Sequence, residues 1–194
     1  MRKLKLVEHI TLDGIIQVSG APGDEFPYGD WSAKYRSPAG LAMVLEIYGE
    51  KFDLLLGRKT YDAWSGFWPK APASPMGDRL NAATKYVVTH RPESLSWGPF
   101  EGITDLVNGV RAIKEKGGPD IVLSGSSTLT STLIEHGLAD EVVMLVNPVL
   151  MGQGKRFFAQ GTPARELVFQ TTKVSPTGIL INSYKVAEPI PKQK

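Results

Sequence analysis

The sequence has no cysteine among its 194 residues. This absence excludes disulfide bonds, thiolate zinc sites, iron–sulfur clusters and a cysteine nucleophile. A large excess of charge of one sign is also missing. The 22 Lys and Arg residues are balanced by 20 Asp and Glu residues, which leaves a net charge of +2. So small a net charge favours neither nucleic acid nor a membrane as the main partner.

Long apolar runs are absent as well. No segment approaches the roughly 18 apolar residues of a transmembrane helix. The basic N-terminus reaches Glu8 and His9 before it forms the apolar stretch of a signal peptide. We therefore expect a cytoplasmic protein with one domain over residues 1–187. Residues 188–194, with two prolines and two lysines, are expected to form a flexible C-terminal tail.

Three signatures of common sites are missing too. The histidines His9, His90 and His136 lie far apart in the sequence, so we expect no metal. No G-x-S-x-G motif supports a hydrolase, and no G-x-G-x-x-G motif supports an ordinary Rossmann domain.

What the sequence does contain is an alternation of apolar strand-like runs with helix-like segments, which predicts an α/β fold. Two C-terminal runs, 166–174 and 179–186, favour a hairpin across 175–178. We therefore expect a mostly parallel central sheet with an antiparallel C-terminal hairpin. The strands are expected at 4–12, 53–56, 86–89, 121–123 and 141–149, and the helices at 41–48, 58–64, 128–136 and after Thr104, the expected cap. Residues 19–38 are predicted to form a long functional loop.

The strongest chemical signal is the turn Ser124-Gly125-Ser126-Ser127-Thr128-Leu129, which follows a buried strand and begins a helix. Glycine allows a phosphate to approach the backbone, and a helix N-terminus supplies free N–H groups. This pattern predicts an anion site. The alternative is an ordinary turn in which Ser or Thr caps the helix.

Two further strand ends carry cations. Gly57-Arg58-Lys59-Thr60 places two cations at a helix start, where they oppose the helix dipole unless an anion binds, although they could also be simply solvated. Thr89-His90-Arg91-Pro92 is the third such end. Three strand ends with donors predict a dinucleotide at the carboxyl edge of the sheet, and the extra cation favours NADP over NAD.

Carboxylates that could donate a proton lie in or near the long loop. They are Asp13, Asp24, Glu25 and Asp30. We consider Asp13 the first catalytic candidate and Asp30 the second. The structural alternative for Asp13 is that its carboxylate holds the turn before Gly14 through hydrogen bonds to the backbone.

Five motifs in this order resemble one family. They are Ile10-Thr11-Leu12-Asp13-Gly14, Leu55-Leu56-Gly57-Arg58-Lys59-Thr60-Tyr61, Val88-Thr89-His90-Arg91-Pro92, Ser124-Gly125-Ser126-Ser127-Thr128-Leu129 and Pro148-Val149-Leu150-Met151-Gly152-Gln153-Gly154. Over residues 3–187 the chain resembles the dihydrofolate-reductase-like superfamily. It is most similar there to stand-alone homologues of the C-terminal reductase domain of the riboflavin-biosynthesis bifunctional deaminase–reductase.

The resemblance implies a three-layer α/β/α domain, a homodimer, and NADPH across the carboxyl edge of a sheet of about eight strands. By position, Gly57, Arg58, Lys59 and Thr60 would meet adenosine and phosphate groups, and Thr89 and Arg91 the ribose phosphate. Gly125, Ser126, Ser127, Thr128 and Leu129 would hold the pyrophosphate. The implied reaction is hydride transfer from NADPH to a small pyrimidine- or pterin-like heterocycle.

One departure from the family pattern bears on the substrate. Dihydrofolate reductases carry an acidic residue a few positions after a loop Trp. Here the positions three to six residues after Trp31 are Lys34, Tyr35, Arg36 and Ser37, none of which is acidic. Without that acid, reduction of a dihydropterin lacks its usual proton donor. The alternatives are a binding protein that has lost catalysis and a true dihydrofolate reductase.

Overall fold

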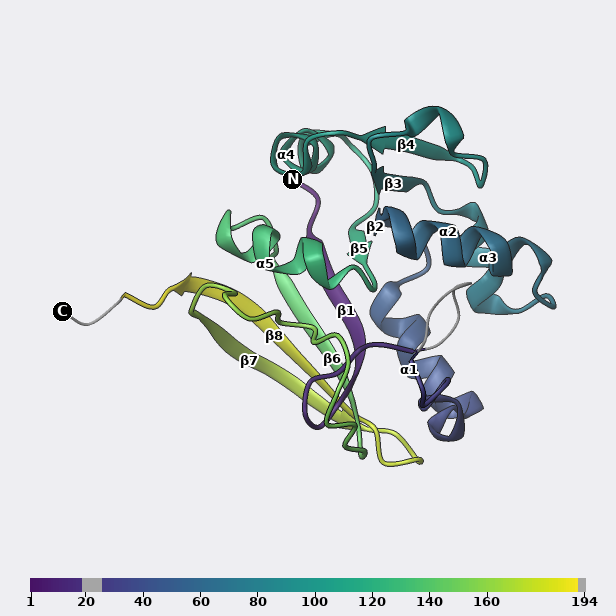
Figure 1. Cartoon of the computed structure of the whole chain (residues 1–194), viewed down its shortest axis with the longest axis vertical. Coiled ribbons are helices and arrows are strands. Elements are labelled where there is room, and N and C mark those ends of the chain that lie inside the picture. The colour runs from purple at the N-terminus through teal and green to yellow at the C-terminus, as the bar shows by residue number, and fades with distance from the viewer. Residues whose placement is uncertain (19–25, 192–194) are drawn as a thin grey trace.

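A computed structural model describes residues 1–18 and 26–191 of the chain. Its strands form one eight-stranded sheet in the order β4-β3-β2-β5-β1-β6-β8-β7 (Figure 1). The strands β1 to β6 run parallel, and the hairpin of β7 and β8 adds the antiparallel end. The strands are β1 (Leu4–Thr11), β2 (Asp53–Gly57), β3 (Lys85–Val88), β4 (Phe100–Ile103), β5 (Ile121–Leu123), β6 (Glu141–Asn147), β7 (Arg165–Val174) and β8 (Leu180–Pro189).

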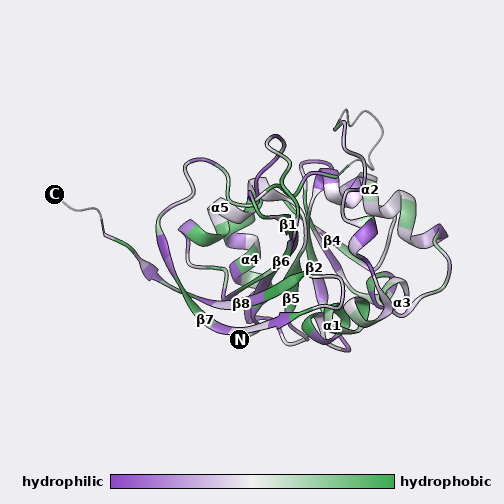
Figure 2. Ribbon diagram, turned by 90° about the horizontal axis from the view of Figure 1, so that it is seen from below, coloured by the Kyte–Doolittle hydropathy of each residue, from purple (hydrophilic) through white to green (hydrophobic). Residues whose placement is uncertain are grey.

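Helices cover both faces of this sheet (Figure 2). They are α1 (Pro38–Tyr48), α2 (Arg58–Phe67), α3 (Pro75–Ala82), α4 (Leu106–Glu115) and α5 (Ser127–Glu135). Side chains alternate between the faces of a strand, so β1 contributes to two cores. Leu4 and Leu6 pack with α4 and α5, whereas Val7 packs with α1, α2 and α3. The expected three-layer α/β/α fold is confirmed.

Two elements were not predicted. The helix α3 has little apolar periodicity, although Ser74 caps it by accepting a hydrogen bond from the N–H of Gly77 at 3.1 Å. The strand β4 is a short edge strand in which only Ile103 is buried. Neither segment carries a pattern strong enough to separate it from a loop.

Two of the boundaries that differ from expectation have a clear physical reason. Asp105, and not Thr104, caps α4, because its carboxylate accepts the N–H of Asn108 at 3.0 Å. At the other end of the chain, β8 runs through Pro189, the second residue of the segment expected to be a tail. The N–H of Ile190 also bonds to Ala164 O at 3.1 Å, so pairing with the start of β7 orders this segment.

Ion pairs hold the amino edge of the parallel strands. Arg2 pairs with Asp53 at the start of β2, and both side chains are largely buried. Lys114 of α4 pairs with Asp140, the residue before β6, at 2.5 Å. Within the residues that the structure describes, no helix is both long and apolar enough to span a membrane.

Candidate functional site

The carboxyl ends of β2, β3 and β5 meet in one cluster. Ser126, after β5, accepts a hydrogen bond from the N–H of Gly57 at 2.8 Å, and its Oγ lies 3.0 Å from Thr60 Oγ1. A Cβ at Gly57 would lie 2.7 Å from Ser126 Oγ, and one at Gly125 would lie 2.9 Å from Thr60 Oγ1. Only glycine therefore allows these two turns to approach so closely.

The start of α5 is not capped by a side chain. Ser126 occupies the cap position in a left-handed conformation with a φ of 60°, and its hydroxyl makes no cap hydrogen bond. Gly125 before it also has a positive φ, of 71°. The alternative of an ordinary Ser cap is therefore wrong, because this hydroxyl turns to Gly57 instead. Backbone N–H groups at such a turn and helix start form a concave anion site.

Arg58 joins the carboxyl end of β2 to the turn after β3. Its guanidinium donates to Asp62 Oδ1 at 2.8 Å, to Ser94 Oγ at 2.6 Å and to Arg91 O at 3.2 Å. The side chains of Lys59 and Arg91 are exposed beside it, and neither forms an ion pair with any residue in 1–18 or 26–191. Two uncompensated cations therefore lie at this edge, with Thr89 buried beneath them.

Glu8 is a functional candidate that sequence reasoning missed. Its carboxylate accepts the N–H of Gly125 and, at 3.0 Å, the N–H of His9. Burial raises the pKa of the Glu8 carboxyl to about 7, against an ordinary value of 4.5, while the two backbone N–H groups oppose that shift. The signal was present in the sequence, since Glu8 interrupts the apolar alternation of Leu4, Leu6 and Ile10.

His9 lies on the other face of β1, near the charged side chains of Arg36 and Asp30. Burial lowers the pKa of His9 to about 4, and the nearby charges of Arg36 and Asp30 have smaller, opposite effects. Asp30 accepts hydrogen bonds from Arg36 at 2.5 Å and from Ser32 Oγ at 2.7 Å. Asp30, the second catalytic candidate, is thus held as an acceptor in an exposed ion pair.

Asp13 is held in a turn. It accepts hydrogen bonds from Thr11 Oγ1 and from the N–H groups of Gly152 at 2.7 Å and Met151 at 3.2 Å. The Thr11 hydroxyl is the main cause that lowers the pKa of Asp13. An ionised carboxylate accepts hydrogen bonds but has no proton to donate, so these contacts match the structural alternative. Asp24 and Glu25 lie outside the described residues.

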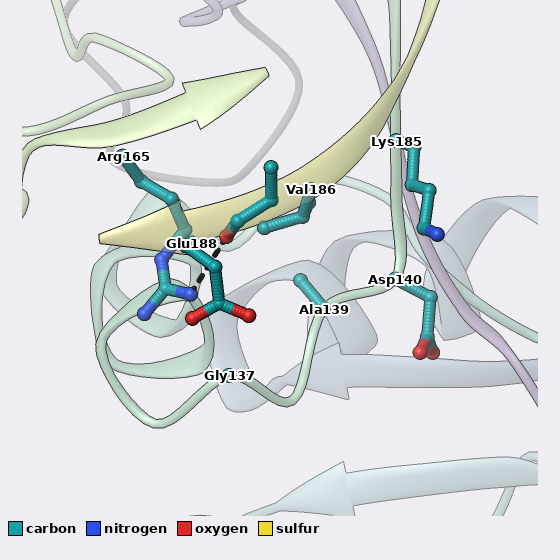
Figure 3. A pocket seen from close by; sticks show the side chains of 8 residues that line it. Gly137, Ala139, Asp140, Arg165, Lys185, Val186 and Glu188 are labelled. Carbon is teal, nitrogen blue, oxygen red and sulfur yellow. Dashed lines mark hydrogen bonds between the residues drawn. The ribbon is translucent and has the colours of Figure 1, made fainter. Parts of the chain in front are cut away.

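A hollow at the opposite edge of the sheet is separate from this cluster. It is lined by residues such as Asp140, Arg165 and Lys185, and Arg165 donates to Ala187 O at 2.9 Å (Figure 3). Asp140 precedes β6, so the hollow lies at the amino edge of the parallel strands. Among the described residues, no three His, Asp or Glu side chains are grouped to hold a metal ion.

A comparison with family models matches residues 2–181 to the model described as the RibD C-terminal domain. The chain belongs to the RibD C-terminal domain family. Two curated relatives from Bacillus subtilis (strain 168), the uncharacterized proteins YyaP and YwjB, are each 27% identical to it. The matches span 183 residues, or 92% of both chains, for YyaP and 176 residues, or 89% of this chain and 91% of the relative, for YwjB.

Solved structures show that this RibD C-terminal domain has the dihydrofolate reductase fold. A putative riboflavin biosynthesis protein from Shewanella sp. PV-4 aligns with a TM-score of 0.69 at 16% identity, covering 96% of this chain and 99% of its own. A pyrimidine reductase-like protein from Corynebacterium diphtheriae gives 0.66 at 12% identity, covering 96% and 92%. Dihydrofolate reductase from Enterococcus faecalis, complexed with NADP(H) and RAB-propyl, gives 0.63 at 17% identity, covering 96% and 97%.

Proposed function

We propose that the chain is an NADPH-dependent reductase that transfers hydride to a small pyrimidine- or pterin-like heterocycle. The activity would be similar to that of 5-amino-6-(5-phosphoribosylamino)uracil reductase in riboflavin biosynthesis. One observation carries the proposal. Ser126 and Arg58 tie three strand ends into one cluster that presents an uncapped helix start and two uncompensated cations. Membership of the RibD C-terminal domain family supports it.

The chemistry of the cluster fits a phosphorylated dinucleotide. Gly125 through Leu129 would hold the pyrophosphate, because backbone N–H groups and hydroxyls are donors suited to it. The Glu8 carboxylate already acts there as a stand-in anion on the N–H of Gly125. Gly57 through Thr60 would meet the adenosine and adjoining phosphates. Arg91, with Thr89 beneath it, would meet the ribose phosphate that distinguishes NADPH from NADH.

In this mechanism the bound cofactor supplies the hydride, and the protein supplies binding and orientation. The turn around Asp13 fixes the edge of the site beside β1, because Leu12 N–H bonds to Val149 O at 2.9 Å and Asp13 holds Gly152. His9 is neutral at physiological pH, so it adds no charge to the buried side of that edge. Since Asp13 and Asp30 are engaged as acceptors, we assign the accompanying proton to solvent water.

A substrate screen tests this proposal. The purified protein is mixed with NADPH carrying deuterium on the reactive face and with a panel of pyrimidines and pterins. We expect loss of the reduced-nicotinamide absorbance with one class of compound, and mass spectrometry should find one deuterium in the product. If NADPH binds but no heterocycle in either class accepts the label, the protein is a binding protein and the reductase proposal is overturned.

We also propose that two copies of the chain associate through β7. This strand forms one edge of the sheet and exposes Phe169 and Val174. An edge strand presents unpaired N–H and C=O groups that a second copy can pair with. Light scattering should give twice the chain mass for the wild type and for Phe100→Glu, a control at the opposite edge, but the single mass for Phe169→Glu. A monomeric wild type would refute this association.

A further inference from the structure

Glu8 lies just beyond the point where β1 and β5 separate. Pairing of β1 with β5 extends only as far as Leu6 opposite Leu123. Beyond that pair β5 turns away at Ser124 and Gly125, while β1 continues beside β6. Two residues beyond that last pair, Glu8 reaches across the gap and its carboxylate accepts the N–H of Gly125. The carboxylate therefore lies at the end of β5, where the glycine turn begins.

The charge of Glu8 is not neutralised by a cation. The residue of β6 that lies opposite Glu8 is Met144. Leu6 and Ile10 flank Glu8 on the same face of β1. The turn after β5 and the start of α5 carry the uncharged Ser124, Ser126 and Ser127. Two titratable groups lie nearby. His9 is neutral near pH 7, because burial lowers its pKa to about 4. Tyr48 of α1 shares a hydrogen bond with Ser124 and also stays neutral, because burial raises its pKa to about 12. Nowhere in 1–18 and 26–191 does Glu8 form an ion pair.

We propose that the Glu8 carboxylate is an internal anion that occupies the Gly125 amide in place of a diphosphate, so that the cofactor binds only when Glu8 is protonated. This inference rests on the proposed function, because it assigns a role to Glu8 in the same binding site. Glu8 is here a cofactor-binding residue whose protonation state makes cofactor affinity depend on pH.

The physical reason is that two anions compete for one donor. A carboxylate and a diphosphate oxygen cannot both accept the single N–H of Gly125, and their like charges repel. Protonation removes that charge and gives the carboxyl an O–H that can donate to a phosphate oxygen. The energetic cost of protonating Glu8 is small near neutral pH, because burial holds its pKa at about 7.

The first test compares wild type with Glu8→Gln, which removes the charge but keeps an acceptor for the N–H of Gly125. The dissociation constant of NADPH is measured by tryptophan quenching at pH 6 and pH 8. Binding that requires a protonated group of pKa about 7 weakens about tenfold over this interval. We expect the ratio of the wild-type to the Glu8→Gln constant to rise about tenfold from pH 6 to pH 8. Taking the ratio cancels the titration of the 2′-phosphate, which is common to both proteins.

A matched control removes one negative charge elsewhere. Glu115 is exposed at the end of α4, so Glu115→Gln should keep the wild-type pH dependence. A ratio for Glu8→Gln that does not change with pH, while both proteins bind NADPH, would overturn the role of Glu8 and leave the proposed function intact. Failure of both proteins to bind NADPH at either pH would overturn the proposed function itself.

Proton uptake provides a second test on the wild-type protein alone, in case Glu8→Gln does not fold. Calorimetric titrations with NADPH in two buffers of different ionisation enthalpy give the number of protons bound with the cofactor. NADH titrations remove the contribution of the 2′-phosphate. For a group of pKa about 7, uptake should be about 0.9 proton at pH 8 and about 0.1 at pH 6. Equal values at both pH values would contradict the proposal.

Discussion

The two edges of the parallel sheet use charged side chains in opposite ways. At the amino edge, opposite charges are paired between neighbouring segments, as in Arg2 with Asp53, Lys114 with Asp140 and Lys3 with Glu141 at 2.7 Å. At the carboxyl edge, Lys59 and Arg91 form no ion pair with any described residue, and Glu8 is a half-buried carboxyl without a cationic partner. Paired charges tie these segments together, whereas the unpaired cations of the carboxyl edge are what the proposed binding of an anionic cofactor requires.

The largest effect should come from breaking a pair at the amino edge. Asp53→Ala leaves the buried Arg2 guanidinium without its carboxylate, and removing one partner of a buried pair costs about 3–5 kcal/mol. Urea unfolding should show this loss, while the NADPH dissociation constant measured under native conditions stays unchanged. Glu141→Ala, at an exposed pair of the same edge, should cost less than about 1 kcal/mol. Unfolding free energies within error of one another for these two variants would refute the distinction.

The next effect should come from the cations of the carboxyl edge. Arg58→Ala combined with Arg91→Ala should weaken NADPH binding about a hundredfold, because each charge-assisted hydrogen bond is worth about 1.5–3 kcal/mol. NADH lacks the ribose phosphate and would lose only the contact of Arg58 with the adjoining phosphates, so its binding should weaken about tenfold. Arg111→Ala, at an exposed cation of α4, serves as the control and should change neither constant. Equal losses for NADPH and NADH in the double variant would contradict the assigned phosphate role.

A smaller effect should distinguish two glycines at the two ends of α5. Gly125 before the helix and Gly137 after it both have positive φ angles, of 71° and 62°, so an alanine strains both positions. Only at Gly125 does the added Cβ meet another residue, Thr60 at 2.9 Å. Both variants should lose stability, but Gly125→Ala should weaken NADPH binding about tenfold relative to Gly137→Ala. Thermal unfolding and cofactor titration measure the two effects separately.

The smallest effect concerns Asp13. Asp13→Asn should destabilise the protein by about 1 kcal/mol at neutral pH, because its charged hydrogen bonds to Thr11 and Gly152 become weaker. The folded pKa of Asp13 lies below its ordinary value of 3.8, so this contribution is present above that value and is lost as pH falls through the folded pKa. The difference from wild type should therefore be constant between pH 8 and pH 5. A variant of unchanged stability that no longer transfers hydride would instead identify Asp13 as the proton donor.

Much of the fold could be predicted from local patterns. Apolar runs such as 121–123 and the alternation in β1 identify strands without any knowledge of their neighbours. The fold class and the family followed from them and from motifs at strand ends. The segments α3 and β4 could not be found in this way, because β4 acquires its structure by pairing with β3, and α3 by contacts such as that of Asn81 with Trp68 after α2.

The candidate site shows the same limit. The three turns after β2, β3 and β5 could be recognised one by one, but their contacts through Arg58 and Ser126 depend on strand order, which the sequence does not reveal. Glu8 and Gly125 are 117 positions apart and meet because β1 and β5 are neighbours. The sequence could not decide between a catalytic and a structural role for Asp13 for a related reason. The N–H groups that hold its carboxylate belong to Met151 and Gly152, which are far away in the sequence.

The central claim is that the carboxyl edge of this sheet binds NADPH. The most direct measurement is a parallel titration of the purified protein with NADPH and NADH, followed by tryptophan quenching and by thermal shift, since a ligand that binds only the native state must raise its stability. We predict saturable NADPH binding at micromolar concentrations and NADH binding at least about tenfold weaker. Failure of both cofactors to bind at millimolar concentrations would contradict the claim.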